Sequence, residues 1–194
     1  MKLYLKGKEI LTNAGYVDIG MDHFALTNDA LYQAWQNGTL HRNFMGYTTH
    51  ADCDLIGLGV SAISHIGDSF SQNPRDLPGW EIALDQGQPP VWRGLALDRD
   101  DLIRGDVIQQ LMCNGAIDIG LIERRHDIDF DQYFGAALLR LVPLIEDGLA
   151  VRTGDRIAAT SRGRLLLRII AMCFDKYLEK SDAAAARPRY SRVI

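Results

Sequence analysis

The segment with the most evident chemical potential is Asp54–Asp68, which has the sequence DLIGLGVSAISHIGD. Its first half, Leu55–Val60, is a short apolar run with two glycines, and such a run predicts a buried strand that a ligand or another backbone approaches closely. The second half is small, polar and turn-forming. A buried strand that opens into a loop of small residues is how α/β sheets and barrels present ligand sites at strand ends. The same pattern also fits glycines that merely relieve crowding beneath a helix.

The cysteines and histidines argue against a metal site built by this chain. Three cysteines stand alone in the sequence, and none belongs to a CxxC, a CxxxCxxC or a Cys/His cluster. The five histidines show no HExxH-like pairing. An odd number of isolated thiols is typical of a reducing compartment and of small buried residues. The cysteines are Cys53, Cys113 and Cys173.

Composition limits the class of protein. The chain has 194 residues, of which 47% are hydrophobic and 24% charged, as in an ordinary globular protein. No apolar run approaches the roughly 20 residues needed to span a bilayer, and the charged first residues, MKLYLKGK, do not resemble a signal peptide. The net charge of -4 lacks the basic field of a nucleic-acid binder. We therefore expect a cytoplasmic protein that does not act on membranes or nucleic acids.

The elements that must position the candidate residues alternate at first and then become helical. We expect a helix over residues 2–13, a strand over 16–20, and a helix through Trp35 that is capped within Thr27–Asp29 and closed by Asn37–Gly38. Together with the strand at Leu55, this order predicts a parallel α/β arrangement. After the loop at residues 87–90, we expect helices and a two-stranded ribbon, an order that resembles a winged-helix unit. The helices are expected over 98–113, 131–146 and 161–180, and the ribbon within 148–159.

Several segments resemble one family, the oxygen-independent coproporphyrinogen III oxidases, which are radical S-adenosylmethionine enzymes of haem biosynthesis. The resemblance covers essentially the whole chain, but only the C-terminal part of a typical family member. It implies an α/β fold in which residues 1–88 form the C-terminal part of a radical SAM (β/α) barrel, followed by a mainly α-helical, winged-helix-like domain over 89–194. The segments are IGLGVSAIS at 56–64, GMDHFA at 20–25, LHRNFMGYTT at 40–49, WRG at 92–94, DVIQQLMCN at 106–114, GRLLLRIIAMCFDKYL at 163–178 and the terminal SRVI.

The resemblance also implies a reaction and its cofactors. Family members oxidatively decarboxylate two propionates of coproporphyrinogen III to vinyl groups, using S-adenosylmethionine and a [4Fe–4S] cluster held by a CxxxCxxC motif. That motif is absent here, so the chain supplies no catalytic residue or metal ligand, and we expect no activity without the missing N-terminal half of the barrel. Gly59, Ser61 and Ile63 correspond to the part of the family that contacts the adenine side of S-adenosylmethionine. On periodicity alone, Ile63 fits ordinary core better, and only the resemblance makes the ligand contact an equal alternative.

Two polar side chains are candidates for the substrate. Coproporphyrinogen carries four carboxylates, so Arg42 is a natural bidentate anchor, and His23 is suited to donate to a propionate or relay a proton. The alternative for both is a hydrogen-bonded loop packed beneath the barrel.

Two other functions remain open at this point. One is a non-catalytic haem- or porphyrin-binding module, with His23 paired with Met21 or His65 as axial ligands. The other is a winged-helix DNA-binding regulator that uses the arginines between Arg152 and Arg168. The apolar residues of the last predicted helix disfavour an exposed recognition helix there.

Overall fold

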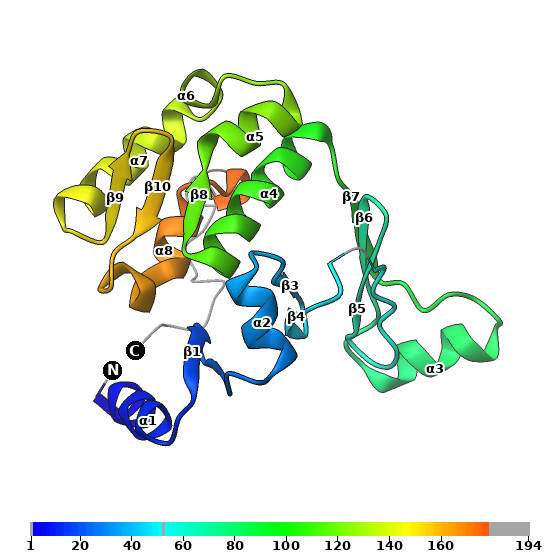
Figure 1. The fold of residues 1–194 in the computed structure, drawn as a ribbon. Helices are drawn as coiled ribbons and strands as arrows, with labels where there is room; N and C mark the ends of the chain where they lie inside the picture. The colour runs from blue at the N-terminus through cyan, green and yellow to red at the C-terminus, as the bar shows by residue number, and fades with distance from the viewer. Residues whose placement is uncertain (1, 52, 179–194) are drawn as a thin grey trace. The chain divides into compact units, whose positions relative to one another are not determined.

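The structure, a computed structural model, describes residues 2–51 and 53–178 and is a mixed α/β fold (Figure 1). It separates into two compact units. The first contains the residues up to Thr49 and those from Arg104 onward, and the second is His50–Ile103. The domain boundary predicted near residue 88 stays a prediction. The terminal SRVI segment lies outside the described residues.

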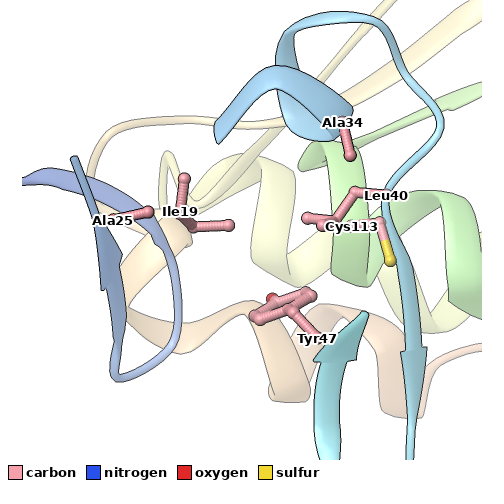
Figure 2. Packing of buried hydrophobic residues seen from close by; sticks show 6 residues of the cluster. All are labelled: Ile19, Ala25, Ala34, Leu40, Tyr47 and Cys113. Atoms are coloured by element: carbon pink, nitrogen blue, oxygen red, sulfur yellow. The ribbon is translucent and has the colours of Figure 1, made fainter. Parts of the chain in front are cut away.

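The N-terminal part of the first unit consists of two helices and two hairpins. The helix predicted over residues 2–13 is confirmed, and the backbone NH of Leu31 donates to Asp29 Oδ1 at 2.8 Å, which confirms the predicted cap. Side chains from these elements meet Cys113 in a small cluster with Ile19, Ala25, Ala34, Leu40 and Tyr47 (Figure 2). The elements are α1 (Lys2–Asn13), β1 (Val17–Gly20), β2 (His23–Ala25), α2 (Ala30–Gln36), β3 (His41–Asn43) and β4 (Gly46–Thr48); β1 pairs with β2 and β3 with β4, both antiparallel.

The C-terminal part of the same unit packs helices on a three-stranded antiparallel sheet of order β8-β10-β9 (Figure 1). The ribbon predicted within 148–159 is confirmed as β9 and β10. Phe130, Phe134 and Phe174 are almost fully buried, and the ring centroids of Phe134 and Phe174 lie 5.5 Å apart. The elements are α4 (Arg99–Asn114), β8 (Ala116–Asp118), α5 (Ile119–His126), α6 (Phe130–Tyr133), α7 (Gly135–Glu146), β9 (Ala150–Thr153), β10 (Arg156–Ala159), the 3-10 helix η1 (Gly163–Leu166) and α8 (Leu167–Met172).

The predicted helices agree with the structure where their caps are local. Helix α4 begins where expected, because Asp98 Oδ1 accepts the backbone NH of Asp101 at 2.8 Å. The helix predicted over 131–146 is instead divided into α6 and α7 at the buried Phe134. No helix in residues 2–51 and 53–178 is long and apolar enough to cross a membrane.

The helix predicted over 161–180 was too long within the described residues, since it begins as η1 and α8 ends at Met172. Two half-buried arginines hydrogen-bond the backbone carbonyls that follow its last residue. Arg140 donates to the Cys173 carbonyl, and Arg104 donates to the Phe174 carbonyl at 3.0 Å.

The second unit is held by hydrogen bonds rather than by a hydrophobic core. Strands β5 (Ile63–Ile66), β6 (Ser69–Gln72) and β7 (Arg93–Ala96) form an antiparallel sheet in that order, and α3 (Leu77–Asp85) lies between β6 and β7 in sequence. Between His50 and Leu102 no described apolar side chain is buried. The buried residues there are two polar ones, Ser64 and Asn73.

The prediction of a buried strand over Leu55–Val60 is wrong. Leu55 forms only an isolated antiparallel bridge with His65, and Leu58 is 88% exposed. The two glycines explain the difference: Gly59 has a φ of +96°, which no strand contains, and the loop's backbone groups bond to side chains instead of to a strand. The predicted parallel sheet is likewise wrong for this chain, because every pairing among its described strands is antiparallel.

Truncation of Phe174 tests whether the three-phenylalanine cluster stabilises the first unit. We expect F174A to lower the free energy of unfolding by about 3–5 kcal/mol, because it removes a buried ring and leaves a cavity that the neighbouring phenylalanine rings fill only in part. Urea unfolding followed by circular dichroism measures the change. L139A is the control, since Leu139 in α7 is 75% exposed. Equal losses in both variants would contradict this assignment of the core.

Candidate functional site

Tyr47 is the central residue of a polar cluster in the first unit. Its hydroxyl donates to the Met112 carbonyl near the end of α4 at 2.7 Å, and the side chain points into the small apolar cluster (Figure 2). Gly20 leaves the space that the hydroxyl occupies, because a Cβ at Gly20 would lie 2.7 Å from that oxygen. The ring is therefore fixed between the β1–β2 hairpin and α4.

His23 packs against this tyrosine. The two rings meet edge to face with centroids 4.9 Å apart, and a Cβ at Gly46 would lie 2.8 Å from the imidazole Nε2. Nδ1 of His23 lies 2.9 Å from Asp22 Oδ1, but the pair is not aligned as a hydrogen bond. The buried Nδ1 thus has no hydrogen-bond partner among the residues that the structure describes.

Arg42 lies directly opposite Tyr47 in the β3–β4 hairpin, with its guanidinium carbon 5.8 Å from the centre of the ring. Its backbone carbonyl accepts a hydrogen bond from Nε2 of Gln109 at 3.1 Å, and this bond connects the hairpin to α4. The Nε of Arg42 is buried and has no partner within the described part of the chain. The structure therefore places His23 and Arg42, the two candidate substrate residues, against the same aromatic ring, that of Tyr47.

The same cluster holds two acidic groups in their neutral forms. Burial raises the pKa of Tyr47 to about 12, and the neighbouring Cys113 thiol adds to this shift. Burial likewise raises the pKa of Cys113 to about 12, although the positive charge of Arg42 opposes the shift. At neutral pH, Tyr47 is thus a hydrogen-bond donor and Cys113 an inert buried thiol rather than a nucleophile.

The three candidate cofactor residues lie in the second unit, on the loop that leads into β5. Gly59 and Ser61 both have positive φ, +96° and +60°, and Ile63 begins β5 as a half-buried residue. A Cβ at Gly59 would meet nothing within 4 Å, so the space beside this residue is open.

Two polar side chains, Asn73 and Gln72, hold this loop. Asn73 is 7% exposed, and its Nδ2 donates to the Gly59 carbonyl at 2.8 Å. Gln72 donates through Nε2 to the Ser61 carbonyl at 3.1 Å. The signal that they have this role is their position at the end of β6, where Gln72 pairs with Ile63 and Asn73 follows directly, and it becomes apparent only once the register is known.

The chain does not fit an iron–sulfur cluster. Residues 2–51 and 53–178 contain no group of three or more His, Cys, Asp or Glu side chains that could hold a metal ion. Cys113 and Cys173 are buried and Cys53 is exposed. Cluster ligands would therefore have to come from another segment or another chain.

Comparison with known proteins gives a consistent result. A family described as the HemN C-terminal domain matches residues 97–166. The oxygen-independent coproporphyrinogen III oxidase of Escherichia coli K12 is 49% identical over 184 residues, which are 95% of this chain and 40% of that protein. The enzyme of the same name from Pseudomonas aeruginosa is 47% identical over 194 residues, 100% of this chain and 41% of that protein. The chain spans about two fifths of the length of these relatives.

A solved structure agrees with the sequence comparisons. The E. coli coproporphyrinogen III oxidase, described there as a radical SAM enzyme, matches with a TM-score of 0.85 and 48% identity over 89% of this chain and 40% of its own. Fold and sequence thus place the chain with part of a radical SAM enzyme. The chain is a homologue of the oxygen-independent coproporphyrinogen III oxidases and corresponds to their C-terminal portion, which confirms the resemblance.

The raised pKa values of Tyr47 and Cys113 predict a loss of stability in base. Unfolded tyrosine and cysteine ionise near pH 10 and 9, whereas the folded groups resist ionisation until about pH 12. This contribution to the free energy of unfolding is therefore fully present below pH 9 and is lost as the pH rises to 12, by up to about 3 kcal/mol for Tyr47 and about 4 kcal/mol for Cys113. Urea unfolding from pH 8 to 11 measures the slope.

The double variant Y47F/C113A should show a shallower slope than the unmodified chain. Y16F is the matched control, because Tyr16 is 37% exposed and should leave the slope unchanged. An identical slope in the double variant and the unmodified chain would show that these two groups are not the source.

Proposed function

We propose that this chain is the C-terminal portion of an oxygen-independent coproporphyrinogen III oxidase. The complete enzyme would convert coproporphyrinogen III to protoporphyrinogen IX by oxidative decarboxylation of two propionates. The observation that carries the proposal is the TM-score of 0.85 at 48% identity to part of a radical SAM enzyme of that name. In this proposal residues 1–88 complete the barrel, residues 89–194 form the C-terminal domain, and the chain alone is inactive.

Arg42 and His23 would bind the substrate. Each has a buried nitrogen that makes no aligned hydrogen bond to a described residue. His23 Nδ1 also lies 2.9 Å from the Asp22 carboxylate, so the cost of a buried unpaired donor applies in full to Arg42. A propionate oxygen is a suitable acceptor for both, since an arginine fork matches a carboxylate. Tyr47 would keep the two side chains in place, because its ring contacts both and its hydroxyl is fixed on Met112.

Gly59, Ser61 and Ile63 would contact the adenine side of S-adenosylmethionine. When it is bound beside a reduced [4Fe–4S] cluster, this cofactor supplies the radical that abstracts hydrogen from the substrate. The chain's own contribution is positional: Gly59 leaves open space, Ile63 offers an apolar surface, and Asn73 fixes the backbone between them.

The composition of the second unit supports a partner that covers it. Leu58 is 88% exposed, Ile56 67%, and the described apolar side chains between His50 and Leu102 include no buried one. A domain normally buries such residues against another layer of structure. The missing N-terminal half of the barrel, which would carry the cluster, is the partner that we propose.

The two alternative functions have weaker support. As an axial haem ligand, His23 would have to free its Nε2 from close packing against Gly46. As the recognition helix of a DNA-binding regulator, α8 would present Ile169 and Met172, which are 40% and 48% exposed. An apolar outer face is unsuited to the phosphates of a DNA groove.

A chimeric enzyme tests the proposal. The C-terminal two fifths of the E. coli oxidase would be replaced by this chain, and protoporphyrinogen formation would be measured anaerobically, after oxidation to the porphyrin. We expect the chimera to be active and the isolated chain to be inactive. An inactive chimera that still assembles its cluster and folds would contradict the proposed function.

Variants of the chimera separate the two sets of residues. R42A should raise the KM for coproporphyrinogen about tenfold, the loss expected for one charged hydrogen bond, and leave the KM for S-adenosylmethionine unchanged. I63A should do the reverse. R162A, which alters an exposed arginine outside both sets, is the control. If R42A and R162A behave alike, Arg42 is not a substrate anchor.

A further inference from the structure

The WRG segment forms an unusual arrangement of two arginines on one tryptophan. The guanidinium carbons of Arg75 and Arg93 lie 5.0 Å and 4.7 Å from the centre of the Trp92 ring. The tryptophan is 53% exposed, and both arginines are exposed as well. Stacking on an aromatic ring restrains a guanidinium group while leaving its NH donors available to a ligand.

Among the described residues these arginines form no ion pair, although their unit is rich in carboxylates. The second unit, residues 50–103, contains eight aspartates and one glutamate against three arginines and no lysine. Two of the three arginines nevertheless lie on Trp92, and neither forms an ion pair with any residue that the structure describes. Two positive charges beside one ring repel each other, and an anion bound to both would remove that repulsion.

The cluster is connected to the loop that we assign to the cofactor. Nε of Arg93 donates to Gln72 Oε1 at 2.9 Å, and Nε2 of the same glutamine donates to the Ser61 carbonyl at 3.1 Å. Gln72 thus orients Arg93 and the loop at once. A ligand group held by Arg93 would lie within two hydrogen bonds of Ser61.

The neighbouring residues indicate what kind of anion would bind. Val91 is 53% exposed and Leu95 41%, so the arginines lie next to accessible apolar surface. The surrounding aspartates would repel a polyanion such as a nucleic acid, whose charges follow one another closely. A ligand with separate carboxylates on an apolar body satisfies both conditions.

We propose that Arg75 and Arg93, stacked on Trp92, form a carboxylate site for a propionate side chain of the tetrapyrrole substrate. This inference rests on the proposed function. The substrate has four propionates, and two of them are converted to vinyl groups. The other two keep their carboxylates throughout the reaction, so they are available for binding. Arg93 binds one carboxylate through its fork, Arg75 neutralises it from the same ring, and Gln72 couples that contact to the cofactor loop.

Nuclear magnetic resonance of the ¹⁵N-labelled full chain tests the site. The indole NH of Trp92 and the Nε–H of Arg75 and Arg93 would be followed while three probes are added separately: succinate, coproporphyrin III and S-adenosylmethionine. We expect coproporphyrin III to shift all three resonances at a lower concentration than succinate does, and S-adenosylmethionine to leave them unchanged.

Variants then assign the contacts. R75A and R93A should each raise the Kd for coproporphyrin III about fivefold, as fits an exposed ion pair, and R93K should lose part of the affinity because it lacks the fork. R162A is the matched control and should bind as the unmodified chain does. Q72A should broaden the Arg93 Nε–H signal while retaining the shift of Trp92.

Each other outcome overturns a different statement. If coproporphyrin III binds but the three resonances and the two arginine variants are unaffected, the site is wrong and the proposed function stands. If succinate shifts the resonances and coproporphyrin III does so no better, the carboxylate site stands and the tetrapyrrole assignment fails. Shifts by S-adenosylmethionine alone would assign the carboxylate to the cofactor, and no response to any probe would exclude the site.

Discussion

The hydrogen bond from the Tyr47 hydroxyl to the Met112 carbonyl is the interaction on which the candidate substrate site depends. It joins residues 65 positions apart, and it is buried. Through it, a short hairpin that could not be stable alone is fixed on a 16-residue helix. The positions of His23 and Arg42 follow, because both side chains lie against the tyrosine ring. The glycines at 20 and 46 are required for the same reason, since a side chain at either would displace one of these rings.

The two units are stabilised in different ways, and the difference matches their proposed roles. The first has an aromatic core around Phe134, in which the large rings are almost fully buried. The second depends on Asn73 and Ser64, whose side chains bond to the backbone of Gly59 and Gly57. Buried amide hydrogen bonds specify a loop conformation well but add little net stability. A unit of that kind gives a precise loop only when another surface completes its packing.

Local signals in the sequence predicted the fold best. Asp29 and Asp98 mark helix starts because a cap depends on only a few neighbouring residues. The apolar run Leu55–Val60 misled the prediction, because its meaning depends on what covers it, and in this chain it is largely exposed. His23 and Arg42 were accessible from residue type, and their unpartnered nitrogens add to that hypothesis. Tyr47, Gln72 and Asn73 were not, since their roles come from contacts between strands whose register no local pattern encodes.

The cofactor loop shows how bonding within the chain limits what it can recognise. The side-chain amide of Asn73 donates a hydrogen bond to the Gly59 carbonyl, and the backbone NH of Asn73 donates to the Ala62 carbonyl. The side-chain amide of Gln72 donates to the Ser61 carbonyl, so the carbonyls of Gly59, Ser61 and Ala62 each already accept a hydrogen bond from within the chain. An adenine amino group needs an acceptor, and here it would find few on the backbone. In the proposed function, this loop would therefore contact a heterocycle by shape and by the apolar surface of Ile63, and residues outside the loop would supply the hydrogen bonds to the base.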